Sequence, residues 1–159
     1  MQTKWIRTLR LIPLTCVALF FSSCSYSTDF VVVNESNQAI EVLYKPKTEF
    51  GQLSSLDAPV ATNSSELDSK NRPNWLKLAS TQYEFDESTR TVTVRLEAGK
   101  ALRVITMHNY GNEHPHTAAS FPIDYISLSG PSGSITFAGN QTRVSFRYVS
   151  ANLYTLTYK

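Results

Sequence analysis

The residues whose types and spacing could support chemistry lie between positions 108 and 116. All three histidines of the chain are here, His108, His114 and His116, together with Glu113. Imidazole nitrogens are common ligands of zinc and copper, and a carboxylate can add an oxygen ligand. His114 and His116 are two residues apart, so their side chains point to the same side of an extended chain. The cluster predicts a zinc or copper site. The alternative is a solvated loop between strands, because the spacing matches no established metal motif.

Aromatic side chains beside polar segments suggest a second kind of site. Trp75 and Tyr110 flank such segments, as do Tyr83 and Tyr125. Exposed rings at such positions can stack against a sugar or a peptide. We therefore consider Trp75 and Tyr110 as a platform for a glycan. The alternative is that these rings lie in the core or against cross-strand neighbours, as aromatic residues in sheets usually do.

Residues for a hydrolase are also present, although no motif joins them. Ser129 or Ser132 could form a Ser–His–Asp set with one of the histidines and Asp124. The sequence after Gly130 reads Pro-Ser-Gly-Ser, which is not the G-x-S-x-G pattern of a nucleophile elbow. The chain also has no phosphate-binding glycine loop, CxxC or HExxH motif. We therefore predict that the protein is not an enzyme.

Alternating apolar and polar residues recur through the chain and predict an all-β fold. β-branched and aromatic residues dominate these runs, and turn residues separate them at intervals of about 8–12 residues. The runs cover residues 30–33, 40–44, 92–96, 102–105, 126–128, 135–137, 144–148 and 153–158. The first run is continuously apolar, which indicates a strand buried on both faces. About eight or nine short strands predict a single antiparallel β-sandwich with Greek-key, immunoglobulin-like connections; a closed barrel is the alternative.

Residues 45–74 interrupt this pattern. They are rich in Ser, Asn, Asp and Pro, with apolar residues scattered among them. A loop of this length without secondary structure is uncommon in a compact domain. We expect a long crossover loop between sheets here; the alternative is that the segment contains an element that the pattern does not show. The next residues, 75–79, fit either one helical turn or a short strand.

The N-terminal segment has the composition of an export signal. Lys4, Arg7 and Arg10 form a basic leader without an acidic residue, and residues 11–22 are mostly apolar. Small residues follow this apolar run, as they do before the cleavage site of a secretory signal peptide. The run is too short to span a bilayer, which takes about 20 apolar residues. The segment therefore predicts export rather than membrane insertion.

The end of this segment reads Phe21-Ser22-Ser23-Cys24 and resembles the lipobox of bacterial lipoproteins. It departs from the usual pattern at Phe21, where leucine is commoner. The resemblance implies that Cys24 carries diacylglycerol and becomes the new N-terminus after cleavage. Position 25 is Ser rather than Asp, which implies the outer membrane in a host with two membranes. The alternative is ordinary cleavage near Ser23, which releases a secreted protein.

Composition and charge limit the remaining classes. The chain has 159 residues, of which 42% are hydrophobic and 18% charged, so a single folded domain is expected and a disordered chain is not. Removing the three basic residues of the leader leaves 12 basic against 13 acidic residues, a net charge of −1. This balance argues against nucleic-acid binding through a basic surface. We expect a signal peptide at 1–23, a short tether at 24–28 and a β-sandwich at 29–159.

These observations predict a lipoprotein that is lipid-anchored in the bacterial cell envelope, with its N-terminal lipid in the membrane. Its expected role is that of a non-catalytic accessory or protein-interaction module whose partner is another envelope protein. The alternative is a ligand-binding module, for metal through His108, His114 and His116 or for a glycan through Trp75 and Tyr110. A hydrolase is the third hypothesis.

Overall fold

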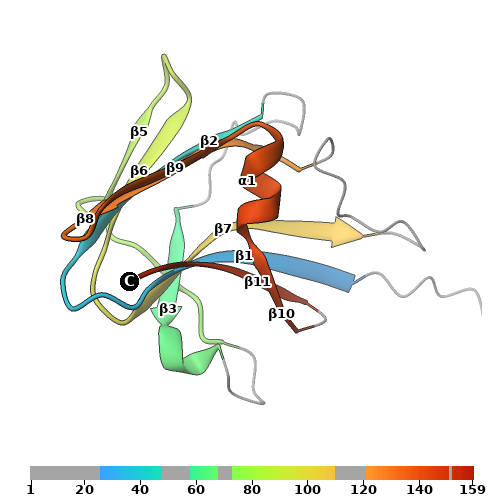
Figure 1. Cartoon of the computed structure of the whole chain (residues 1–159), viewed down its shortest axis with the longest axis horizontal. Coiled ribbons are helices and arrows are strands. Elements are labelled where there is room, and N and C mark those ends of the chain that lie inside the picture. Colours follow the sequence, from blue (N-terminus) through green and yellow to red (C-terminus); the bar gives the residue numbers. More distant parts are fainter. Residues whose placement is uncertain (1–25, 48–57, 68–72, 110–120, 151) are drawn as a thin grey trace, which may run out of the picture.

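Two β-sheets lie face to face in the computed structural model, which describes residues 26–47, 58–67, 73–109, 121–150 and 152–159 (Figure 1). The six-stranded sheet has the order β10-β11-β1-β7-β3-β4, and the five-stranded sheet has the order β5-β6-β2-β8-β9. The strands of the first sheet are β1 (Tyr26–Asn34), β3 (Val60–Asn63), β4 (Leu76–Lys77), β7 (Lys100–Asn109), β10 (Arg147–Ser150) and β11 (Leu153–Tyr158). Those of the second are β2 (Ile40–Pro46), β5 (Tyr83–Asp86), β6 (Thr91–Leu96), β8 (Ile123–Gly130) and β9 (Gly133–Ala138). The prediction of an all-β sandwich is confirmed.

The alternation of side chains explains how the five-stranded sheet forms its half of the core. Along β2, residues Ile40, Val42 and Tyr44 are buried and Glu41 is exposed, as the two-residue period of a strand requires. β6 repeats the pattern and lies antiparallel beside β2, with Val42 opposite Val94. The two strands therefore turn one apolar face toward the six-stranded sheet and a polar face toward solvent.

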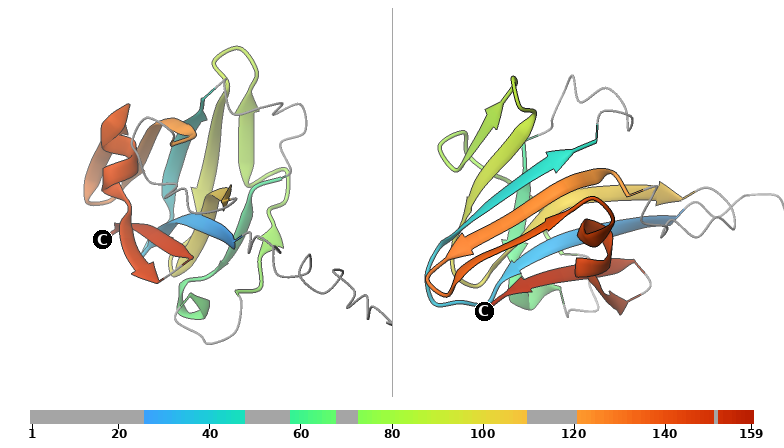
Figure 2. Two further views of the ribbon diagram at one scale, coloured as in Figure 1. Left: turned by 90° about the vertical axis from the view of Figure 1, so that its right-hand side faces the viewer. Right: turned by 45° about the horizontal axis from the view of Figure 1, so that its top comes forward.

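Strand β1 lies in the middle of the six-stranded sheet and is buried on both faces, as its continuous apolar sequence predicted. Phe30 and Val32 belong to the main core between the sheets, whereas Val31 and Val33 belong to a second, smaller cluster. β1 pairs in parallel with β11 and antiparallel with β7. Figure 2 shows these three strands side by side. The C-terminal strand is thus an integral part of the sheet.

The hairpin of β8 and β9 is fixed by a buried tyrosine from the other sheet. The Tyr158 hydroxyl accepts a hydrogen bond from the Ser132 N–H at 3.0 Å and donates one to the Gly133 carbonyl at 2.8 Å. A Cβ atom at Gly130 would lie 2.7 Å from Ile40 Cγ2 and 2.9 Å from the Tyr158 hydroxyl, so only glycine fits there. These contacts set the position of β9 at the edge of its sheet.

Two segments differ from their sequence-based expectation. Strand β3 and a 3₁₀ turn (Ser64–Glu66) lie within residues 45–74, where we expected a long crossover loop. β3 has only four residues, and its pairing with β7 is long-range, so the local sequence pattern does not predict it. Residues 144–148 were expected to be one strand, but helix α1 (Asn140–Ser145) ends only at Ser145. The ambiguous segment at 75–79 contains the two-residue strand β4.

Candidate functional site

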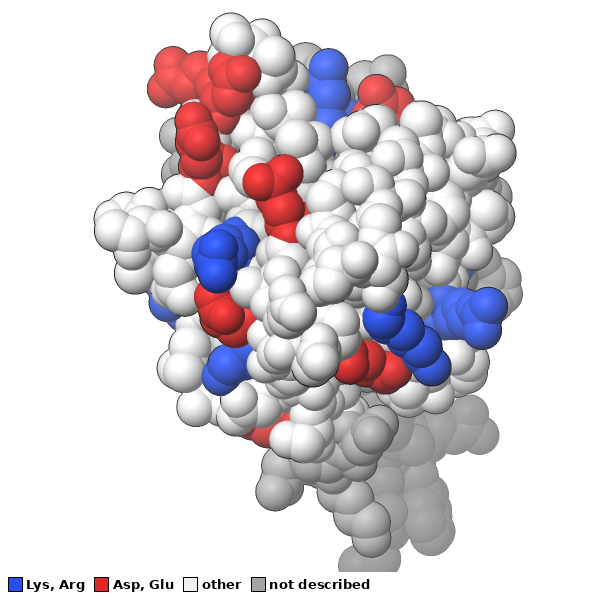
Figure 3. Space-filling view, turned by 60° about the vertical axis from the view of Figure 1, so that its left-hand side comes forward, with Lys and Arg blue, Asp and Glu red and all other residues white. Residues whose placement is uncertain are grey.

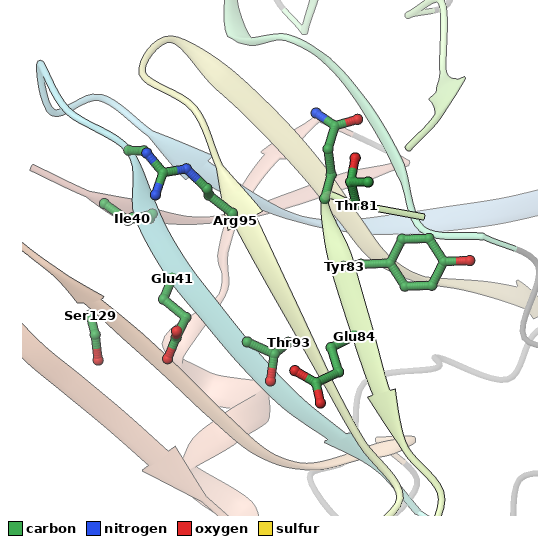
Figure 4. Close-up of a pocket in the computed structure, with 10 residues that line it drawn as sticks. Ile40, Glu41, Thr81, Tyr83, Glu84, Thr93, Arg95 and Ser129 are labelled. Atoms are coloured by element: carbon green, nitrogen blue, oxygen red, sulfur yellow. The ribbon is translucent and has the colours of Figure 1, made fainter. Parts of the chain in front are cut away.

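A shallow hollow of about 500 Å³ lies on the solvent-facing side of the five-stranded sheet (Figure 4). Strand alternation accounts for the charged and hydroxyl-bearing residues that β2, β5, β6 and β8 contribute to its lining, because their side chains point away from the core. Glu41 on β2 lies opposite Arg95 on β6 and opposite Ser129 on β8, and Glu84 on β5 lies opposite Thr93 on β6. The full lining comprises Ala39, Ile40, Glu41, Thr81, Gln82, Tyr83, Glu84, Thr93, Arg95 and Ser129.

The charges around the hollow are mostly acidic. Glu41 and Glu84 line it, while the Arg95 Nε donates to the Glu97 carboxylate at 3.1 Å. That ion pair is exposed, so solvent weakens it. Figure 3 shows further acidic side chains toward the upper end of this face, where the β5–β6 hairpin lies. The hollow can offer hydrogen bonds to a polar ligand, but its lining contains neither histidine nor cysteine.

The pKa values that shift among the described residues have local, structural causes. Four hydrogen bonds from Ser88 and Thr89 lower the pKa of the Asp86 carboxyl from 3.8 to about 2, and they close the β5–β6 turn. The Asn74 N–H is the main cause of the lowered pKa of Glu66. Burial raises the pKa of the Tyr44 hydroxyl far above its ordinary value of 10.0. None of these three groups lines the hollow.

The predicted metal and lipid sites fall largely outside the described residues. Cys24, His114 and His116 lie outside them, and so does Tyr110. The backbone of His108 belongs to β7, where it lies opposite Ser27 of β1. Within the described ranges, no group of three or more His, Cys, Asp or Glu residues could hold a metal ion. The zinc or copper site therefore stays a prediction.

Trp75 is described, and it is partly buried. It packs against the second cluster, which contains Val31 and Val33, and the Arg103 guanidinium lies 4.9 Å from its ring centroid. The ring thus covers the outer face of the six-stranded sheet next to β4. A role for Trp75 in binding a glycan stays a prediction.

The serines and the aspartate considered for a hydrolase are not brought together. Asp124 and Ser129 lie near opposite ends of β8, five residues or about 16 Å apart along the strand. The Ser129 hydroxyl contacts the Ser134 hydroxyl at 2.9 Å. Ser132 lies in the hairpin turn, where its N–H binds Tyr158.

Exposed apolar side chains are concentrated in one short segment of the chain, which includes an edge strand of the six-stranded sheet. Three of the six large hydrophobic residues that are exposed in the described part lie within six consecutive positions, Val144 (70% exposed), Tyr148 (63%) and Val149 (47%). They belong to α1 and to the edge strand β10, and we call them the α1–β10 patch. Sequence patterning did not identify this patch, because Val144 and Tyr148 alternate with polar residues in the way that the core positions of a strand do.

Comparisons with protein-family models, with curated proteins and with solved structures give no match for this chain. Within the described ranges, no helix combines the length and hydropathy needed to cross a bilayer.

Proposed function

We propose that the protein is a lipid-anchored lipoprotein of the bacterial cell envelope that acts as a non-catalytic protein-interaction module. The α1–β10 patch is the observation that carries the interaction role. Exposed apolar side chains are ordinary when scattered, but a local concentration of them is typical of a surface that a partner covers. Tyrosine in particular contributes strongly to protein interfaces.

The position of the patch suits docking by a protein. Tyr148 lies on edge strand β10, and its ring contacts the ring of Tyr154 edge-on at 5.5 Å. Tyr154 in turn stacks on the buried Phe30 at 5.1 Å. The exposed ring is therefore supported by the core and loses little conformational freedom when a partner covers it. The partner we propose is an envelope protein with a complementary apolar surface.

Site-specific photo-cross-linking of the full-length protein in its native membranes tests this role. A photoreactive phenylalanine at position 148 should give one discrete adduct with a second envelope protein. The matched control is the same residue at Phe85, an exposed aromatic position on β5 of the other sheet. We expect an adduct yield several-fold higher at position 148, and Val149→Asp should remove it. Equal adducts from both positions, or none from position 148, would contradict the proposal.

The anchor is tested in the same membranes. Cys24→Ala removes the thiol to which diacylglycerol would be attached, so the protein should move from the membrane fraction to the soluble fraction. Cys24→Ser offers a hydroxyl of similar size and should behave in the same way. Retention of both variants in the membrane fraction would show that the attachment is not a lipid on Cys24.

A further inference from the structure

Strand β9 forms a long and open edge of the five-stranded sheet. It pairs with β8 over six consecutive residue pairs, from Tyr125–Ala138 to Gly130–Gly133, without a register shift. Among the described residues no strand pairs with its other side, and helix α1, which begins at Asn140, contacts it. Five of its six residues are exposed, and only Phe137 is partly buried against the core.

One hydrogen bond shows which backbone groups of β9 face the open side. The Gly139 N–H donates to the Asp124 carbonyl at 2.8 Å, so this pair is of the hydrogen-bonded kind. Hydrogen-bonded and non-hydrogen-bonded pairs alternate along antiparallel strands. Ser134, Thr136 and Ala138 therefore direct their N–H and C=O groups away from β8.

Side-chain contacts across β8 and β9 agree with this assignment. Side chains approach more closely in non-hydrogen-bonded pairs. The Thr136 hydroxyl lies 3.0 Å from that of Ser127, and the Ser134 hydroxyl lies 2.9 Å from that of Ser129. Both are pairs that the alternation assigns to the non-hydrogen-bonded kind.

The other three sheet edges carry features that discourage pairing with another strand. β4 has two residues, one of them Lys77. β5 carries Glu84 and Asp86. β10 carries Arg147 and has a register shift between Tyr148 and Ser150. Charges, short length and bulges are the means by which natural edge strands avoid addition of another strand.

β9 has none of these features. Its sequence, Gly-Ser-Ile-Thr-Phe-Ala, contains no charged residue and no proline, and its β-branched and aromatic residues favour an extended chain. Such an edge is a template for strand addition. It is thus the one edge among the described strands that is open to another strand.

We propose that β9 is a self-association surface, at which β9 of a second copy adds antiparallel about a twofold axis at Thr136. The absence of charge favours a second copy, because self-pairing of a charged strand can place like charges opposite each other. In this register, the residues whose backbone N–H and C=O groups face the open edge lie opposite each other. Thr136 pairs with Thr136 of the second copy, and Ser134 pairs with Ala138 of the second copy. About six backbone hydrogen bonds then form. Ile135, 40% exposed in the single chain, meets Phe137 of the second copy on the core side.

The area of this contact sets its expected strength. Two six-residue strands bury less than the roughly 800 Å² per partner that a stable interface needs. The dimer should therefore be weak in dilute solution. Confinement of both copies near one membrane surface would raise their effective concentration and favour it.

Disulfide trapping of the full-length protein tests the pairing. Thr136→Cys places two thiols at a hydrogen-bonded pair, where the Cα atoms are about 5.5 Å apart, a distance that suits a disulfide. The matched control is Thr93→Cys, which faces the same side of the sheet from the interior strand β6. Cys24 is present in both variants, so its contribution is the same. Under mild oxidation, we expect disulfide-linked dimer several-fold above the control for Thr136→Cys.

A charge at the same position provides the second measurement. Thr136→Lys opposes two cations at the twofold axis. It should abolish the dimer that native mass spectrometry detects in concentrated solutions of the unmodified protein, and, because position 136 is exposed, it should not lower the melting temperature of the protein. Equal trapping of both cysteine variants would overturn the proposal. A chain that is monomeric with and without Thr136→Lys, or trapping of Thr136→Cys by a different protein, would overturn it as well.

Discussion

Replacing Phe30 by alanine is expected to lower the free energy of unfolding by about 3–5 kcal/mol. Phe30 is fully buried on the central strand β1. Its ring centroid lies 4.8 Å from that of Phe121, 5.5 Å from that of Phe146 and 5.1 Å from that of Tyr154. Alanine would remove the ring that all three contact. Tyr154 lies on β11, Phe121 lies just before β8 and Phe146 lies just after α1, so these neighbours cannot all move inward to fill the cavity.

The buried Arg143 of α1 adds to this cost. Its guanidinium lies 5.3 Å from the Phe30 ring and 4.5 Å from the Tyr154 ring. Its Nε atom has no hydrogen-bond partner among the described residues, and the two aromatic faces give this cation favourable contacts. Alanine at position 30 would leave the cation with one ring fewer.

Urea denaturation followed by fluorescence measures the effect. Phe30→Leu retains much of the volume and should cost clearly less than Phe30→Ala. Phe85→Ala, which removes an aromatic side chain that is 36% exposed on edge strand β5, should cost less than about 1 kcal/mol. A Phe30→Ala protein that is as stable as Phe85→Ala would show that the aromatic cluster does not hold the sheets together.

The strands that sequence patterning predicted correctly are those whose burial depends on alternation alone. β2 and β6 alternate with the same period in sequence and in structure, and the apolar run at 30–33 is buried on both faces. Residues 144–148 alternate equally well, yet Val144 is exposed on a helix and Phe146 is buried. The turn that starts this helix depends on Gly139, with φ of +54°, and on a bond from the Thr142 hydroxyl to the Asp124 carbonyl. That long-range contact leaves no periodic signal.

The surfaces were harder to predict than the strands because they depend on sheet order. Patterning identifies Glu41 and Thr93 as solvent-facing, but only the pairings of β2 with β6 and β8 and of β6 with β5 place them around one hollow. Tyrosine and isoleucine are residue types that usually lie in a core, yet Tyr148 and Ile135 do not. They are exposed because β10 and β9 are edge strands, a property of the assembled sheet rather than of either segment.

Asn34→Ala is expected to destabilise the protein by about 2–4 kcal/mol, because it breaks a buried network at the end of β1. The fully buried Asn34 side chain donates from Nδ2 to the carbonyls of Gln38, at 2.8 Å, and Leu96, at 3.0 Å. Its Oδ1 atom accepts from the N–H and the hydroxyl of Ser36. One side chain thus shapes the β1–β2 turn and ties it to the end of β6 in the other sheet. Alanine would leave the Leu96 carbonyl buried without this donor.

Two further variants separate the network from a general effect on the turn. Asn37→Ala, at an exposed position in the same turn, should change the free energy of unfolding by less than about 0.5 kcal/mol. Asn34→Asp keeps both acceptor contacts to Ser36 but replaces the two donated bonds with a carboxylate facing two carbonyl oxygens, so it should be at least as destabilising as alanine. If Asn34→Asp were instead as stable as the unmodified protein, the acceptor contacts within the turn would be sufficient. The bond to Leu96 would then contribute nothing, and the two sheets would be joined at this end by the Tyr158 hydroxyl bonds to Ser132 and Gly133 and by apolar contacts.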